Sequence, residues 1–130
     1  MIKYVLFVLA VAGGYYYLSR NASLESGLQY IEQHKGASWA PRANYTIGFI
    51  YHQREEYDKA ETAFTQLLTD YPTGQFVARG LFYLEDSAEY VHDWAAAKTA
   101  LDRYIDEYPD GHDVGLMRQR RDLLHYNHGL

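Results

Sequence analysis

The chain has 130 residues, a net charge of −5 at pH 7 and no Cys. The length allows one small domain, and the absence of Cys excludes disulfide scaffolds, Cys-based zinc sites and lipid attachment through Cys. The acidic balance argues against nucleic acid as a partner, because nucleic-acid-binding domains are usually basic. Tyr is unusually frequent, with 14 residues in an aromatic fraction of 16%.

The chain begins with an apolar segment, because residues 4–18 contain no charged side chain. Residues 2–18 reach the lower limit for a transmembrane helix, so we expect residues 1–20 to form an N-terminal membrane anchor. A cleaved signal peptide is the alternative, with residues 10–12 (Ala-Val-Ala) as its cleavage site. The apolar run before that site is short and continues beyond it, which favours the uncleaved anchor.

The flanks of this segment predict its orientation. Lys3 and the free amino terminus precede it, and the acidic body follows Arg20. The positive-inside rule then predicts a single-pass protein of the inner (cytoplasmic) membrane, with a cytoplasmic N-terminus and a periplasmic body. Tyr15, Tyr16 and Tyr17 are expected at the outer membrane interface, where amphipathic rings are favoured.

After the anchor the chain repeats itself with a period of 37 residues. Residues 70–74 (Asp-Tyr-Pro-Thr-Gly) align with residues 107–111 (Glu-Tyr-Pro-Asp-Gly). Residues 21–40 resemble a degenerate earlier copy that forms a half-repeat or connecting helix. A fixed period of this size is the sequence signature of a repeat architecture.

Each unit is predicted to contain two helices, because apolar residues recur at helical spacing. The expected helices cover residues 42–54, 58–71, 76–91, 94–108 and 113–126, and no strand alternation is found. The expected fold is all-α, with an N-terminal transmembrane helix and a short stack of helical hairpins (an α-solenoid). The units are residues 41–74 and 75–111, and residues 112–130 form a capping helix and tail.

These units resemble the tetratricopeptide repeat (TPR) when Pro41 is taken as the first position of its 34-residue motif. The residues that match the packing positions are Gly48, Tyr51, Ala60, Phe64 and Pro72 in the first unit and Ala97, Leu101 and Pro109 in the second. Two positions depart from the motif. Asn44 stands in place of its tryptophan, and Glu85 in place of its glycine, which predicts looser packing there.

The spacing and the Tyr-Pro ending of each unit are similar to bacterial envelope TPR proteins, such as the outer-membrane assembly lipoproteins and the Tol-associated periplasmic proteins. A lipoprotein is excluded because no Cys exists to carry the lipid. The layout of a membrane-anchored periplasmic TPR protein is the closest match.

No motif for catalysis is present. The chain lacks a phosphate-binding glycine loop, an H-E-x-x-H pair and a nucleophile elbow. We expect no enzyme activity, no cofactor, no metal and no small-molecule substrate. His125 and His128 have the spacing of a metal-binding pair, but a pair near a chain end is usually exposed, and no role is assigned to them.

The resemblance implies that the first helix of each unit lines a concave groove that binds protein partners. The groove residues it implies are Arg42, Tyr45, Phe49 and His52 in the first unit and Arg79, Phe82, Tyr83 and Glu89 in the second. The two equivalent arginines could hold a carboxylate. In the alternative interpretation, Tyr45 and Phe82 only cover the neighbouring hairpin. The arginines of residues 118–121 are either a solvated face of the cap or a docking patch.

The predicted function is therefore a non-catalytic scaffold for protein–protein interaction. We expect an accessory or structural subunit of a larger membrane complex, held by residues 2–18 in the membrane. The alternative is a transient periplasmic adaptor or chaperone-like assembly factor for envelope proteins.

Overall fold

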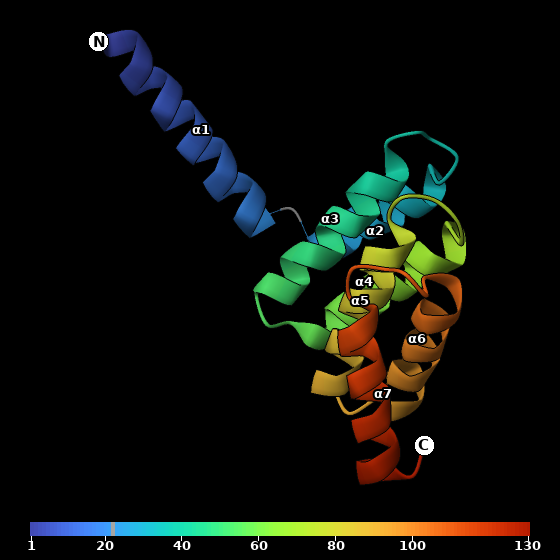
Figure 1. Ribbon diagram of the computed structural model, residues 1–130. Coiled ribbons are helices and arrows are strands. Elements are labelled where there is room, and N and C mark those ends of the chain that lie inside the picture. The colour runs from blue at the N-terminus through green and yellow to red at the C-terminus, as the bar shows by residue number, and fades with distance from the viewer. Residues whose placement is uncertain (22) are drawn as a thin grey trace. The chain divides into compact units, whose positions relative to one another are not determined.

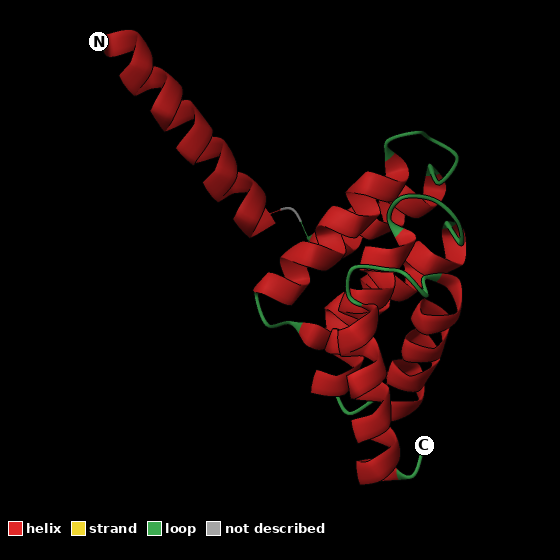
Figure 2. Cartoon of the chain, viewed as in Figure 1, coloured by secondary structure: helices red, strands yellow, loops and turns green. Residues whose placement is uncertain are grey.

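The computed structural model describes residues 1–21 and 23–130, and for residues 17–22 no side chain is described. The described residues form seven helices and no strand (Figure 2). The predicted all-α class is therefore confirmed. The chain divides into two compact units, Met1–His34 and Lys35–Leu130, and each is described by itself (Figure 1).

The first unit contains α1 (Ile2–Asn21) and α2 (Leu24–Gln33). The hydroxyl oxygen of Ser23 caps α2 by accepting a hydrogen bond from the backbone N–H of Glu25, at 3.1 Å. A serine at this position satisfies one of the N–H groups that a helix leaves unpaired at its start. Leu28 and Ile31 lie one turn apart on α2 and are both buried, so this short helix has one apolar side.

The predicted membrane segment requires a correction. Among the residues that the structure describes, no helix is both long enough and apolar enough to cross a membrane. A span needs about 20 consecutive, predominantly apolar residues, and in α1 Lys3, two Gly and several Tyr interrupt the Val, Leu and Phe residues. The transmembrane helix at residues 1–20 is therefore a wrong prediction.

The inner-membrane location, with a cytoplasmic N-terminus and a periplasmic body, is wrong for the same reason, as is the membrane contact through residues 2–18. Of the three tyrosines placed at the membrane interface, Tyr15 and Tyr16 have exposed side chains. Tyr17 lies outside the side chains that the structure describes.

The second unit repeats with the predicted period. The first pair of helices is α3 (Ala40–Gln53) and α4 (Tyr57–Asp70). The bounds of α5 (Val77–Tyr90) and α6 (Trp94–Glu107) are those of the first pair plus 37. The last helix, α7 (Val114–His128), also begins 37 residues after the start of α5. It takes the place of the first helix of a third pair.

Proline and backbone geometry separate the helices. Pro41 lies in the first turn of α3, where its missing N–H costs no hydrogen bond. Pro72 follows the C-cap of α4, and Pro109 follows the C-cap of α6, where proline cannot continue a helix. Between the two helices of each pair, Glu55 and His92 both have a φ of 61°. The two short turns therefore share one left-handed geometry.

Consecutive helices pack side by side along the second unit, and α3 also contacts α5. Small residues allow the close approach. A Cβ atom added to Gly48 would lie 2.8 Å from Cζ of Phe64, so α3 and α4 meet at this glycine. The matched residues Tyr51, Ala60, Phe64, Ala97 and Leu101 are buried in the core. We call α3, α5 and α7, which take the first place in each pair, the inner helices. Packing of this kind fixes their register.

Candidate functional site

The inner helices α3 and α5 run parallel, which the contacts between them show. The guanidinium carbon of Arg42 lies 5.9 Å from the ring centre of Phe76. The rings of Phe49 and Tyr83 lie 5.6 Å apart. Nε2 of His52 lies 2.6 Å from Oδ2 of Asp86. Each of these pairs is separated by 34 residues, so the contacts keep one register along the whole length of both helices.

An aromatic strip fills the middle of the contact between α3 and α5, and it consists of Tyr45, Phe49, Phe76, Phe82 and Tyr83. Tyr45 contacts Phe76 at 5.3 Å and Tyr83 at 6.2 Å between ring centres. Phe82 contacts Tyr83 at 5.3 Å with perpendicular rings. All of these aromatic side chains are half-buried, and perpendicular or offset rings attract one another beyond the gain from burial alone. The structure thus brings together the four predicted groove aromatics, Tyr45, Phe49, Phe82 and Tyr83.

The two predicted arginines lie at one end of this strip, each as the third residue of its helix. Arg79 hydrogen-bonds to the hydroxyl of Tyr83, which is the main cause of its raised pKa, and also interacts with Tyr45. Burial raises the pKa of Tyr45 and outweighs the opposing charge of Arg79. In the part of the chain that the structure describes, no ion pair joins Arg42 or Arg79 to a carboxylate.

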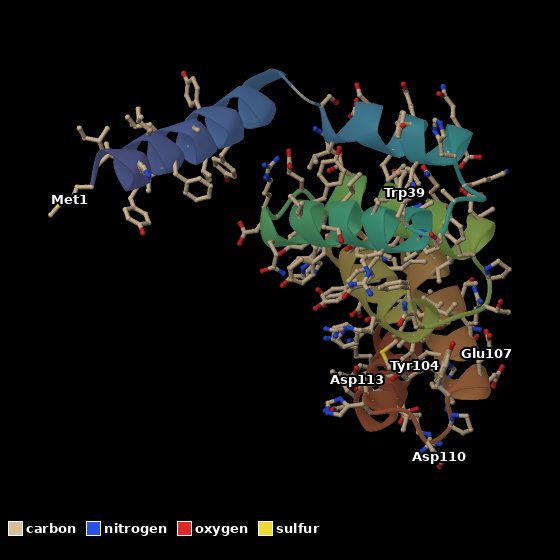
Figure 3. The ribbon with its side chains drawn as sticks, turned by 90° about the horizontal axis from the view of Figure 1, so that it is seen from above. Met1, Trp39, Tyr104, Glu107, Asp110 and Asp113 are labelled. Carbon is tan, nitrogen blue, oxygen red and sulfur yellow. The ribbon has the colours of Figure 1, made fainter. Side chains whose placement is uncertain are left out.

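A cavity of about 380 Å³ opens beside Arg79, lined by Phe82, Tyr83, His112 and Asp113. The loop before α7 is fixed there, because the backbone N–H of Asp113 donates a hydrogen bond to the hydroxyl of Tyr104, at 3.2 Å (Figure 3). The cavity is therefore lined by basic, acidic and aromatic side chains.

A charged network that sequence reasoning missed joins α5 to α7. Glu85 is fully buried, and its Oε2 accepts a hydrogen bond from Nη1 of Arg120 at 2.5 Å. The same nitrogen lies 3.3 Å from Oδ1 of Asp86. Burial raises the pKa of Glu85 to about 8, a hydrogen bond to Glu89 adds to this, and Arg120 opposes it.

This network changes the interpretation of two sequence features. Glu85 does not loosen the packing where the motif has glycine, because its side chain has no exposed surface. Arg120 belongs neither to a solvated face nor to a free docking patch, because it is half-buried against Glu85 and the ring of Phe82. Glu85 and Arg120 are separated by 35 residues, which is close to the repeat period. This spacing was the signal in the sequence that could have identified them as partners.

The other end of the strip is aromatic and acidic. His52 contacts Tyr57 at 5.3 Å, and Tyr57 stacks on Tyr90 with 3.9 Å between ring centres and 5° between planes. The predicted groove residue Glu89 lies in the same turn of α5 as Tyr90. His52 and Glu89 occupy equivalent positions of α3 and α5, and the structure places both at this end.

Two of the remaining histidines stack on Trp94. His128 stacks on Trp94 with 4.0 Å between ring centres, and His92 stacks on the same indole at 5.1 Å. Among the described residues, no group of three or more His, Asp and Glu side chains could hold a metal ion. Asn44, where the motif has tryptophan, is fully buried, and neither polar atom of its side chain has a hydrogen-bond partner.

Comparison with known families agrees with the helical pairs. Residues 42–74 and 86–111 match the family model of the tetratricopeptide repeat. The first segment spans most of α3 and all of α4, and the second spans the end of α5 and all of α6. No curated protein matches the chain. Residues 42–74 and 86–111 of this chain are therefore similar to tetratricopeptide repeats, and the helical pairs at these residues agree with that similarity.

Proposed function

We propose that this protein is a subunit of a larger protein complex and holds a partner in the groove formed by α3 and α5. Tetratricopeptide repeats are interaction scaffolds rather than catalytic folds. The observation that carries the proposal is the pair of exposed arginines, Arg42 and Arg79, beside the half-buried aromatic strip. Arg and Tyr dominate the energetics of protein interfaces, and here they share one surface.

A second surface supports a stable subunit rather than a transient adaptor. The described side chains of α1 are all exposed, including those of Val5, Leu6 and Phe7. A protein of this size rarely exposes so many adjacent apolar side chains unless a partner covers them. An assembled complex would bury this surface continuously, whereas an adaptor would expose it whenever its partner is released.

The test is co-purification of the tagged chain with its partners from its native source. The double variant Arg42→Ala/Arg79→Ala should lose the partner while its helicity stays unchanged by circular dichroism. The matched control is Arg118→Ala/Arg121→Ala, which removes the same charge from α7. Partner loss in the control variant alone would move the binding surface to α7 and refute the groove.

The native mass of the same preparation separates the two roles. A single large species with a constant ratio of chains is expected for a subunit. A species near the 15.1 kDa monomer, with variable amounts of partner, would identify a transient adaptor instead.

A further inference from the structure

We propose that the groove selects a protein segment with separated charges, whose acidic side chains lie over Arg42 and Arg79 and whose basic side chains lie over Glu55 and Glu89. This inference rests on the proposed function and specifies the chemistry of the partner. It follows from the arrangement of charge along α3 and α5, which differs at the two ends of the aromatic strip.

The basic end is open to a ligand. Arg42 and Arg79 are exposed, and their described contacts are with aromatic rings and tyrosine hydroxyls rather than carboxylates. Asp113 lines the cavity beside Arg79 and lies 3.1 Å from Nδ1 of His112, and Asp70 lines a second cavity with Arg42. The two guanidinium groups thus keep unused donors, which a carboxylate can accept in pairs.

The acidic end carries the opposite charge. Glu55 is exposed, and Glu89 is half-buried and shares a hydrogen bond with Glu85. The pKa of the Tyr57 hydroxyl is raised by desolvation, by a hydrogen bond to Tyr90 and by the negative charges of Glu55 and Asp86, so these carboxylates lie near the same tyrosine. The cations at this end are Arg54, the C-cap residue of α3, and Arg120, which already contacts Glu85 and Asp86. An excess of negative charge therefore surrounds the stacked tyrosines.

The positions of these charges oppose the helix dipoles. A helix is stabilised by acidic side chains in its first turn and basic ones in its last turn. Arg42 and Arg79 both lie in first turns that contain no acidic residue, and Glu89 lies in the last turn of α5. The outer helix α4, in contrast, has Asp58 in its first turn. The last turn of α3 carries His52, so only the arginine is repeated. Because folding does not favour an arginine in a first turn, a ligand is the better explanation for its occurrence in both repeats.

The spacing defines the partner. Arg79 and Glu89 are ten residues apart on α5, which corresponds to about 15 Å at the rise of an α-helix. An extended segment covers this distance with about five residues. The partner should therefore carry acidic and basic side chains about five residues apart, with apolar side chains between them for the aromatic strip.

The experiment uses the full chain and two labelled synthetic peptides in fluorescence anisotropy. The first peptide has paired aspartates at one end, paired lysines at the other and leucines between them. The second has the same composition with the charges mixed. We expect the separated peptide to bind about tenfold more tightly, which corresponds to about 1.4 kcal/mol. Arg42→Glu/Arg79→Glu should abolish this preference without lowering the melting temperature, and Arg118→Glu should leave it unchanged.

Equal binding of both peptides, or binding of neither, would overturn the charge preference. Such a result is distinguishable from failure of the groove itself. If the groove binds the native partner, Arg42→Ala/Arg79→Ala would still fail to co-purify with it. A preference that survives the Arg42→Glu/Arg79→Glu exchange would also refute the proposal.

Discussion

The carboxyl group of Glu85 on α5 is buried against the guanidinium group of Arg120 on α7, with 2.5 Å between Oε2 and Nη1. These two residues are separated by 35 positions in the chain and join the last complete repeat to the helix that follows it. Removing one partner of a buried pair leaves the other without compensation, and the cost is larger than for an exposed pair.

Arg120→Ala should therefore destabilise the protein by about 1–3 kcal/mol, because the buried carboxyl of Glu85 loses its hydrogen-bond partner. Urea unfolding followed by circular dichroism at 222 nm measures the change. Arg118→Ala on the exposed side of α7 is the matched control and should change the free energy of unfolding by less than about 0.5 kcal/mol. Equal changes in the free energy of unfolding for the two variants would show that the pair of Glu85 and Arg120 does not stabilise the protein.

The pH dependence of stability follows from two raised carboxyl pKa values. Burial raises the pKa of Glu85 to about 8, and burial together with Asp93 raises that of Glu61 to about 7. In both cases the folded protein holds the proton more tightly than the unfolded chain does. Their contribution is therefore complete below the unfolded pKa of about 4.5 and is lost as the pH rises to about 8.

We thus expect lower stability at about pH 8.5 than at about pH 5.5. Glu85→Gln and Glu61→Gln should each reduce this difference, because an amide does not titrate. Denaturant unfolding at both pH values tests this. A wild-type stability that rises with pH, or Gln variants with the full wild-type difference, would contradict the assignment.

The two left-handed turns offer a stabilising substitution. Glu55 and His92 both have a φ of 61°, a conformation that costs a non-glycine residue about 1 kcal/mol. Glu55→Gly and His92→Gly should each raise the melting temperature. The neighbouring Glu56 has a φ of −89°, and its carboxylate lies 3.6 Å from Nζ of Lys59. Glu56→Gly should lower the melting temperature, because glycine increases the freedom of the unfolded chain and removes this ion pair. The reverse order in a thermal melt would disprove the argument.

Two glycines in helices should respond oppositely to alanine. In Gly48→Ala the new methyl group would meet the buried ring of Phe64, and such overpacking costs about 2 kcal/mol. In Gly115→Ala on α7 it would meet no atom within 4 Å, so the higher helix propensity of alanine should add about 0.5–1 kcal/mol. Equilibrium unfolding of the two variants compares them directly, and a stable Gly48→Ala variant would exclude a tight contact between α3 and α4.

Much of the second unit was predictable because its information is local and repeated. The helices lie within two residues of their predicted bounds, since apolar spacing and the two Tyr-Pro segments mark each helix and its end. The buried pair of Glu85 and Arg120 was not predicted, because a repeat motif describes one unit and contains no partner from the next. The membrane helix was predicted from an apolar run whose interruptions by Gly and Tyr were given too little weight.

The candidate groove was predicted only in part. Its residue types followed from the motif, but the ring contacts that join Tyr45 to Phe76 and His52 to Tyr57 depend on the offset between α3 and α5. The groove positions themselves remain a prediction until binding is measured.

The arginines in the first turns of α3 and α5 have a consequence for how a partner can be found. A carboxylate that binds over Arg42 and Arg79 would stabilise both helices in the way that an acidic residue in the first turn does. It would supply the negative charge that the first turns of α3 and α5 lack. Binding would therefore be linked to folding, and the correct partner should raise the melting temperature in proportion to its concentration and affinity. The unlabelled protein can then report on its own ligand in a thermal-shift screen.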